Sequence, residues 1–555
     1  MIVTGGWGGG YGAGARSRRS GGAGEMTTDR VWRVAACWPV AWCHGGVLAV
    51  GLALVVALGA PAAAHGQGLE GVVERAVRGA RLGGAEVAVS VRDARTGEAL
   101  ASMNSRQGMV PASNMKLLTS GAALVVLGAE YKFRTRMFVD GSRLVVVGSG
   151  DPAFADPELL RLSGRSLEEF MGELVEPFVR AGVKGLREVV IDDRVFDHEM
   201  VHPGWPRDQL DKWYAAPVSG LNFHANVMEV FVAVGPAVGS APRVRKVPDA
   251  AWLELDNSAR TVGRGGASAL GVQRLLAGGL STAAGARYRL FGELSVTQVE
   301  PIQTALAEPS LVFGQLLADR LGAAGLGQGQ GGGIVARLAE PGEMFSPGAA
   351  LVEVVTPLAE VLARCNIDSY NLYAEALLKR LGREVTGQPG SWDNGAAVVR
   401  MTVTERTGAE LSQLVVTDGS GLSAENRVSA GVLTSWLASL YRDAAVRGAM
   451  VESLAEPGEG TLRKRFKDRR VPGGVHAKSG YINGVQCLSG YVIGERNGRA
   501  AAFSVLVNQT QRVREGGAVK KFHEDVVEAV ARWLDEQPPR TEEPDDGRGQ
   551  ADARR

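Results

Sequence analysis

The chain has 555 residues, which exceeds the usual size of a single domain and suggests two to four domains. Apolar residues make up 45% of it, enough for real cores, and the 75 glycines indicate many turns rather than a helical bundle. A formal net charge of +1 gives no bulk electrostatic reason to bind nucleic acid, so we expect no nucleic-acid partner.

Residues 1–67 have the features of an export leader. Several arginines precede the apolar run VLAVGLALVVALGAPAAAHG (47–66), which ends in the small residues that signal peptidase requires. The apolar part from Val47 to Ala60 is shorter than the ~20 residues of a membrane span. We therefore expect an exported protein, periplasmic if the cell has an outer membrane. An uncleaved anchor, peripheral membrane association and a translation start at Met26 stay open.

The first elements after the leader are a predicted hairpin and a predicted helix. Residues 85–105 alternate apolar and polar side chains around the turn DARTG, as in a β-hairpin. The stretch MKLLTSGAALVVLG (115–128) is apolar on nearly every face and closes on glycine, which indicates a buried helix. Residues 139–344 mix strand-like runs with the helical pattern SLEEFMGELVEPFVRAG and a Gly-rich break at 325–333.

The last third of the chain returns to long regular elements. Residues 368–382 predict a helix that begins at an Asp or Ser cap and stops at a glycine. Residues 474–510 contain three strand-like runs with turns at YING and ERNG, and 521–536 form an amphipathic final helix. Early strands, middle helices and late strands suggest one sheet assembled from both ends of the chain.

These patterns divide the chain into a leader, a discontinuous domain, an insertion and a tail. The discontinuous domain combines 68–138 with 345–536, and the segment 139–344 forms one or two inserted, mainly β or mixed domains. The tail 537–555 is charged, contains prolines and has no apolar periodicity, which predicts disorder.

Two of the four cysteines, Cys37 and Cys43, fall in the leader. The remaining two, Cys365 and Cys487, provide at most one pair, which is no disulfide framework. Free buried thiols and a single disulfide are both compatible with this count.

The stretch PASNMK places Ser113 and Lys116 at the start of the predicted buried helix. Residues three apart on a helix lie on one face, with about 5–6 Å between their Cβ atoms. A serine needs a neighbouring base to become a good nucleophile, and a lysine serves as that base when burial lowers its pKa. By itself, an SxxK pattern is expected about once by chance in a chain of this length, as a helix cap followed by an exposed lysine.

Two further short stretches carry suitable chemistry. In SYN, Ser369 and Asn371 at the mouth of a helix provide a hydroxyl to relay a proton and an amide to orient a substrate amide, although Ser369 also suits ordinary helix capping. In HAKSGYI, Lys478 supplies positive potential, Ser479 a donor to a carboxylate, and Gly480 room for a substrate backbone beside a strand. The alternative without a functional role is that Lys478 is a solvent-exposed lysine on a strand before a turn.

The order of these motifs, SxxK then SxN then K[ST]G, is more specific than any one of them. With them, the chain resembles the D-alanyl-D-alanine carboxypeptidase/endopeptidase family, the class C low-molecular-mass penicillin-binding proteins with a large insertion after SxxK. The resemblance covers roughly 70–535 and extends to VVVGSGDP, VVIDDRVFD, APVSGLNFHAN, VTDGSGLS and GTLRKRF. It implies the serine β-lactamase/penicillin-binding fold, an α/β architecture of the α+β type with an antiparallel sheet flanked by helices, and an insertion beside the active site.

The resemblance also implies roles. Ser113 would be acylated, Lys116 would be its base, Ser369 would relay the proton to the leaving D-alanine and Asn371 would hold the substrate amide. The substrates would be peptidoglycan peptides ending in D-Ala-D-Ala, β-lactams would be covalent inhibitors, and no cofactor or metal would be needed.

At the third motif, the resemblance implies that Lys478 and Ser479 engage the terminal carboxylate, with Gly480 beside them. The oxyanion hole would be the backbone N–H groups of Ser113 and Tyr481. The family usually has Lys-Thr-Gly-Thr here, so Tyr481 replaces a small donor with a large ring. Carboxypeptidase activity is therefore less secure than acylation, whereas Tyr370 in SYN stands at a position that varies in the family.

Three alternatives compete with this interpretation. A β-lactamase or esterase of the same fold is disfavoured by the long insertion and by the lack of a clear deacylating glutamate. A non-catalytic peptidoglycan-binding relative is disfavoured because all the reactive side chains are present. A zinc peptidase is suggested by HEMVH, in which His198 and His202 follow the HExxH pattern. However, this stretch follows a strand-like run and precedes PGWP, which prevents the helix a zinc site needs.

Overall fold

The computed structural model describes residues 2–4 and 68–539, except 267, 276–286, 330–332, 347 and 468. Nearly all of the predicted leader with its two cysteines, the tail beyond 539 and the centre of the Gly-rich break therefore lie outside the described residues. Among the described helices, none combines the length and the apolarity that a membrane crossing requires.

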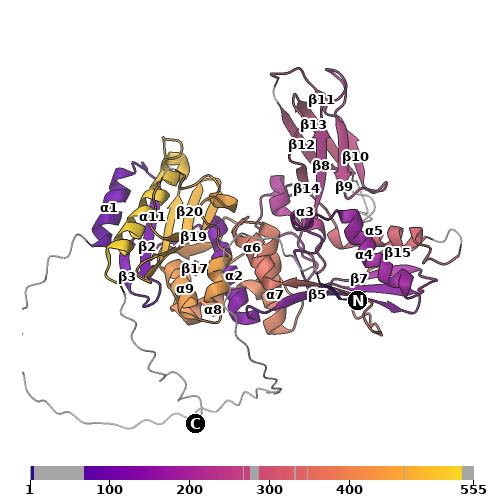
Figure 1. Ribbon diagram of the computed structural model, residues 1–555, viewed down its shortest axis with the longest axis horizontal. Helices are drawn as coiled ribbons and strands as arrows, with labels where there is room; N and C mark the ends of the chain where they lie inside the picture. Colours follow the sequence, from indigo (N-terminus) through magenta and orange to yellow (C-terminus); the bar gives the residue numbers. More distant parts are fainter. Residues whose placement is uncertain are drawn as a thin grey trace, which may run out of the picture. The chain divides into compact units, whose positions relative to one another are not determined.

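A five-stranded antiparallel sheet is built from both ends of the chain (Figure 1), in the order β19-β20-β21-β2-β3. Its strands are β2 (Glu86–Asp93), β3 (Ala99–Met103), β19 (Gly474–Ile482), β20 (Val485–Ile493) and β21 (Ala500–Asn508). This confirms the predicted hairpin at 85–105, the three late strands and the joining of both chain ends in one sheet. Strand β19, which carries the KSG motif, lies at one edge.

Helices pack on the two faces of this sheet. On one face, α1 (Leu69–Gly79) and α11 (Ala518–Glu536) share a buried apolar cluster with the sheet, which confirms the predicted final helix. On the other face lie α9 (Ala430–Arg442) and the helix that follows SxxK, α2 (Met115–Leu127). The two are tied together where Trp436 Nε1 donates to the carbonyl of Leu117 at 3.0 Å. Helix α2 is buried along most of its length, as its composition predicts.

The helix predicted at 368–382 has different ends in the structure. Helix α7 (Asn371–Thr386) begins after Tyr370, whose side chain makes no capping bond, and it runs through Gly382 to a left-handed Gly387. The predicted cap and stop are therefore wrong. Gly382 is instead a contact point with α8 (Trp392–Thr407), because a Cβ there would lie 1.8 Å from the Oδ1 of Asn394. Close packing, not termination, requires glycine at this position.

The remaining described elements form a six-stranded sheet, three small sheets and further helices. A six-stranded sheet has the order β1-β16-β5-β6-β7-β15, with β1 (Ile2–Thr4), β5 (Lys132–Asp140), β6 (Arg143–Val147), β7 (Glu188–Asp192), β15 (Val335–Leu338) and β16 (Val352–Pro357). Three further small sheets contain β4 (Gly108–Met109), β8 (Val227–Ala233), β9 (Arg243–Val247), β10 (Glu254–Asn257), β11 (Arg260–Thr261), β12 (Ala269–Leu275), β13 (Arg287–Leu294), β14 (Ile302–Ala305), β17 (Leu414–Val415) and β18 (Arg427–Ser429). The other helices are α3 (Pro157–Leu162), α4 (Leu167–Arg180), α5 (Pro309–Ala323), α6 (Leu358–Asn366) and α10 (Arg447–Glu452). The predicted domain boundaries stay predictions.

Two glycine-to-alanine changes in helices should have opposite effects on stability. Gly172→Ala lies in α4, where a Cβ would meet nothing within 4 Å, and should stabilise the protein by roughly 0.5–1 kcal/mol through helix propensity. Gly382→Ala gains the same propensity but drives its Cβ into Asn394 and should be destabilising. Thermal unfolding of both variants checks this, and a stabilised Gly382→Ala would contradict the packing argument.

Candidate active site

Ser113 lies in a tight turn that the surrounding chain holds in place. It is the middle residue of a 3-10 turn, Ala112–Asn114, which leads directly into α2. Ala112 has a left-handed φ of 46°, which costs a residue with a Cβ roughly 1–2 kcal/mol. Two glycines allow the close packing around it: a Cβ on Gly421 would lie 1.9 Å from Ala112 O, and one on Gly480 would lie 2.8 Å from Pro111 O. The nucleophile candidate is thus held by neighbours that admit no larger residue.

Lys116 is fully buried one helical turn beyond Ser113 and is surrounded by oxygen atoms. Its Nζ lies 3.0 Å from Ser113 Oγ, 2.7 Å from Asn371 Oδ1 and 3.0 Å from the carbonyl oxygen of Ser420. The structure therefore brings together the SxxK pair and the asparagine of SYN, which are 255 residues apart in sequence. None of the oxygens that it contacts belongs to a carboxylate.

These partners suit a neutral amine. An uncharged amine has two N–H groups and one lone pair, and Asn371 Oδ1 and Ser420 O accept only from N–H groups. In that uncharged form the lone pair is left for Ser113, whose hydroxyl is the one partner able to donate, whereas in the ammonium form Nζ donates to all three oxygens. Burial, the largest influence, lowers the pKa of Lys116 to about 8 despite the opposing effects of nearby Cys365 and Glu375. A pKa of about 8 leaves Lys116 mostly charged at pH 7 but makes the neutral form, which a general base requires, far more accessible than for an ordinary lysine.

The amide of Asn371 is oriented from outside the motif. Its Nδ2 donates to the carbonyl oxygen of Tyr214 at 2.7 Å, which leaves Oδ1 to face Lys116. Because a backbone carbonyl only accepts, this contact fixes which way the amide points. Ser369 lies two residues earlier with a left-handed φ of 63°, and Tyr370 N donates to Arg364 O at 3.2 Å. The SYN motif is therefore a tight turn onto the helix rather than a helix cap.

The third motif lies on edge strand β19. Lys478 is buried with its Nζ 2.8 Å from the carbonyl oxygen of Ser479. Burial and then the charge of Lys116 lower the pKa of Lys478 well below its usual value, so the two lysines oppose each other's protonation. Gly480 packs against the Ser113 turn, whereas the Tyr481 side chain is 71% exposed. Side chains alternate along a strand, so the Tyr481 ring lies on the face opposite Lys478.

The backbone N–H groups of Ser113 and Tyr481 are predicted to form an oxyanion hole. Ala477 N donates away from β20, to Ala455 O at 2.9 Å, and strand alternation turns the N–H of Tyr481 toward the same free edge. The backbone nitrogen of Ser113 lies near this edge, 3.1 Å from where a Cβ on Gly480 would stand. The turn that carries Ser113 therefore packs against the free edge of β19, and the oxyanion hole stays a prediction.

The loop 418–423 completes the site, and its role was missed from the sequence. It supplies the Ser420 carbonyl to Lys116, and it is held by buried Glu375, which accepts from the N–H groups of Gly419 and Ser420 at 2.8 Å each. Thr119 Oγ1 donates to Gly419 O at 2.8 Å, so α2 also holds the loop. The stretch VTDGSGLS in the sequence corresponds to this loop. Its contact with Lys116 could not be predicted, because any residue can supply a backbone carbonyl.

A second set of missed contacts anchors the Ser113 turn to the sheet. Buried Asn114 donates through Nδ2 to Ser489 Oγ at 2.6 Å, and Ser489 Oγ donates to Ser504 Oγ at 2.9 Å. This short polar chain runs from the turn through β20 to β21. It links the position of the nucleophile candidate to the middle of the sheet, where the buried Ser489 and Ser504 lie opposite each other on β20 and β21.

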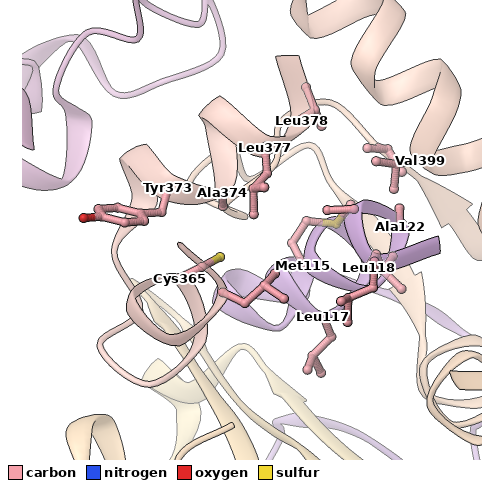
Figure 2. Packing of buried hydrophobic residues seen from close by; sticks show 14 of the residues in the cluster. Met115, Leu117, Leu118, Ala122, Cys365, Tyr373, Ala374, Leu377, Leu378 and Val399 are labelled. Carbon is pink, nitrogen blue, oxygen red and sulfur yellow. The ribbon is translucent and has the colours of Figure 1, made fainter. Parts of the chain in front are cut away.

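The apolar packing behind the site joins α2 to α7 (Figure 2). Met115 and Leu118 of α2 and Leu377 of α7 belong to one buried cluster, which also contains Cys365 at the end of α6. Cys365 and Cys487 are buried free thiols, so the option of a disulfide is not realised. Burial raises the pKa of Cys365 to about 12 even with both lysines nearby, so it stays a neutral thiol and does not compete as a nucleophile.

The HEMVH stretch forms an irregular loop, as predicted, and not a helix. His198 is exposed, 3.7 Å from Asp193 Oδ1, whereas His202 is buried in edge-to-face contact with Trp392 at 5.2 Å. His202 Nδ1 accepts from Gly204 N at 3.0 Å, which fixes the turn. Among the residues that the structure describes, no cluster of His, Cys, Asp and Glu side chains is suited to hold a metal ion.

A serine hydroxyl against a buried lysine, beside an edge strand with free N–H groups, is the arrangement of a serine acyl-transfer enzyme. Sequence comparison gives the family. The chain belongs to the D-Ala-D-Ala carboxypeptidase 3 (S13) family, whose pattern matches residues 69–532. A D-alanyl-D-alanine carboxypeptidase from an Actinomadura species is 32% identical over 89% of each chain. The resemblance stated from the motifs is confirmed, and the chain is a serine-type D-Ala-D-Ala carboxypeptidase by family.

More distant relatives agree on the fold. D-alanyl-D-alanine carboxypeptidase DacB of Haemophilus influenzae is 21% identical over 77% of this chain and 86% of its own length. The crystal structure of penicillin binding protein 4 (dacB) from that organism has a TM-score of 0.64 at 19% identity, over 84% of this chain and 99% of that one. The predicted fold class is therefore confirmed.

The charge state of Lys116 should control the pH dependence of acylation. Only the neutral amine acts as a base, so the second-order rate constant should rise with pH below about 8 and level off above it. Asn371→Asp places a carboxylate beside Nζ, which stabilises the ammonium form and raises the pKa of Lys116. We expect this variant to react more slowly at pH 7 and to need higher pH for its plateau. Stopped-flow acylation by a chromogenic β-lactam measures both profiles, and superimposable profiles would contradict the assignment.

Proposed function

We propose that the protein hydrolyses D-Ala-D-Ala bonds of peptidoglycan stem peptides through an acyl-enzyme on Ser113. The observation that carries the proposal is the 3.0 Å contact between Ser113 Oγ and Nζ of the fully buried Lys116. In the first step, Lys116 takes the Ser113 proton while Oγ bonds to the scissile carbonyl carbon. The N–H groups of Ser113 and Tyr481 receive the developing oxyanion.

The remaining residues divide the later steps between them. The proton passes from Lys116 through the Ser369 hydroxyl to the leaving amine as the C–N bond breaks, and Asn371 orients the substrate amide. Lys478 and Ser479 bind the terminal carboxylate, and Gly480 lets the substrate backbone approach β19. Water then cleaves the ester and restores the Ser113 hydroxyl. The side-chain proximity of Lys116, Ser113 and Asn371 supports this division.

β-Lactams are expected to acylate the same serine, and the protein is expected to act outside the plasma membrane. A β-lactam complex is known for the Haemophilus influenzae penicillin binding protein 4, which has a TM-score of 0.61 to this chain. The leader-like sequence at 1–67 supports export, with a periplasmic location if the cell has an outer membrane. Neither proposed step uses a metal or a cofactor.

Replacement of the nucleophile should abolish covalent labelling. A fluorescent penicillin should label the wild-type protein and leave Ser113→Ala unlabelled, because the alanine has no oxygen to form the ester. His198→Ala and chelator treatment serve as controls and should leave labelling intact. Labelling of Ser113→Ala at the wild-type rate would show that another residue is the nucleophile.

Two defined substrates should separate the activities proposed for the site. A muropeptide monomer ending in D-Ala-D-Ala tests carboxypeptidase activity, and a cross-linked dimer tests endopeptidase activity. We expect the wild-type protein to release D-alanine from the monomer and to convert the dimer to monomers, with Ser113→Ala inactive on both. Product analysis by chromatography and mass spectrometry checks this, and turnover of neither substrate would contradict the proposal.

A further inference from the structure

A cavity of about 910 Å³ adjoins the edge strand of the site and has no role in the reaction described above. The KSG strand contributes Ser479, Gly480 and Tyr481 to its wall, so the cavity is continuous with the proposed carboxylate site. The loop 460–465 and the N-terminal turns of α11 form the other walls. Its volume is far larger than a single D-alanine leaving group needs.

The cavity wall carries an excess of positive charge. Arg463, Lys464 and Lys520 line it, all three are exposed, and none of their charged side chains has a hydrogen-bond or ion-pair partner within the described part of the chain. The acidic residues of the wall are already neutralised. Glu524 is paired with Arg465 at 2.9 Å, and Asp368 is paired with Arg364 at 2.7 Å. The three free cations therefore give the cavity a positive potential.

The first turn of α11 adds to this potential. This helix begins after Gly517, which lines the cavity, and its first turn has no side-chain cap and no acidic residue. It carries Lys520 instead, although a cation at the positive end of a helix is unfavourable unless an anion binds there. Ala518 N already donates to Glu515 O at 3.3 Å, and the N–H groups that follow it in the first turn are suited to such an anion.

A buried polar side chain lies in the same wall without a partner. His523 is only 1% exposed, lines the cavity, and makes no hydrogen bond through Nδ1 or Nε2 to any described residue. Burial lowers its pKa well below the usual value, so the ring is neutral, with one donor and one acceptor. Buried polar groups are normally paired, so the ring has the capacity to bind a polar group of a ligand.

The position of the cavity identifies which part of a substrate reaches it. Its wall includes Ser479, proposed to bind the carboxylate next to the scissile bond, and Asp368, which precedes the proposed proton donor Ser369. Ser479 and Ser369 are both proposed to act on the leaving group, so the cavity lies on the leaving-group side. In a cross-linked substrate, the leaving group is not a single alanine but a whole stem peptide with its own free carboxylates.

We propose that this cavity is a subsite for the leaving stem peptide of cross-linked peptidoglycan, in which Arg463, Lys464, Lys520 and the first turn of α11 bind its free carboxylates. The proposal rests on the proposed function of Ser113 and adds a substrate preference to it. Anionic leaving peptides should be cleaved better than neutral ones, whereas a lone D-alanine should not reach the cationic wall.

The test compares three substrates: the D-Ala-D-Ala monomer, the cross-linked dimer, and the same dimer with the carboxylates of the leaving stem converted to amides. For the wild-type protein, amidation should reduce kcat/KM by about tenfold, the scale of one or two partly exposed charge contacts. The double variant Lys464→Glu/Lys520→Glu should lose about tenfold or more on the unmodified dimer, mainly through KM. It should keep wild-type activity on the monomer.

Lys467→Glu is the matched control, because Lys467 is an exposed cation two residues beyond the loop 460–465 and does not line this cavity. It should leave all three substrates within about twofold of wild type, although its charge change is the same as that of each single replacement. Penicillin labelling of Ser113 should proceed at the wild-type rate in every variant, which tests the nucleophile separately. Equal loss on dimer and monomer, no loss on the dimer, or an equal effect of Lys467→Glu would overturn the subsite. Competition by inorganic polyphosphate without any effect of amidation would also overturn the carboxylate assignment.

Discussion

The buried amine of Lys116 is the group on which the arrangement of the site depends. An amine removed from water must find hydrogen-bond partners in the protein, and a charged amine without a carboxylate in contact is disfavoured. The structure provides an amide oxygen, a backbone carbonyl and a hydroxyl, and only the hydroxyl is able to donate in return. The same burial that disfavours the charge therefore turns the lone pair toward Ser113.

Holding three partners around one nitrogen requires three separate segments of the chain to meet. The 3-10 turn at Ser113, the start of α7 and the loop 418–423 each approach Lys116 from a different direction. The loop 418–423 and strand β19 both come so close to the Ser113 turn that Gly421 and Gly480 leave no room for a Cβ. The strained Ala112 persists in this setting because the packing around it determines its conformation. The pKa of Lys116 is thus a consequence of packing as much as of electrostatics.

Sequence reasoning found the reactive side chains because each motif places them within four residues of one another. The same reasoning predicted the hairpin, the buried helix and the late strands, where apolar periodicity is strong, and the structure confirms them. It failed at Gly382, because the sequence does not distinguish a glycine that allows close contact with Asn394 from a glycine that ends a helix. It also missed Glu375 and the Ser420 carbonyl, whose roles arise from contacts between distant segments. The roles of Ser369, Ser479 and Tyr481 stay proposals.

Part of what orients the site comes from the segment predicted as an insertion. Tyr214 supplies the carbonyl that fixes the amide of Asn371, and without it that amide would be free to turn its N–H groups toward Lys116. Trp205, just after HEMVH, donates through Nε1 to Asp418 Oδ2 at 3.0 Å and so supports the loop that carries Ser420. The HEMVH stretch, whose sequence pattern suggested a metal site, therefore contributes to packing, and the nearby Trp205 supports the loop 418–423 through one indole hydrogen bond. Removal of the insertion would take away the group that sets the Asn371 amide, and with it the acceptor that turns the Lys116 lone pair toward Ser113.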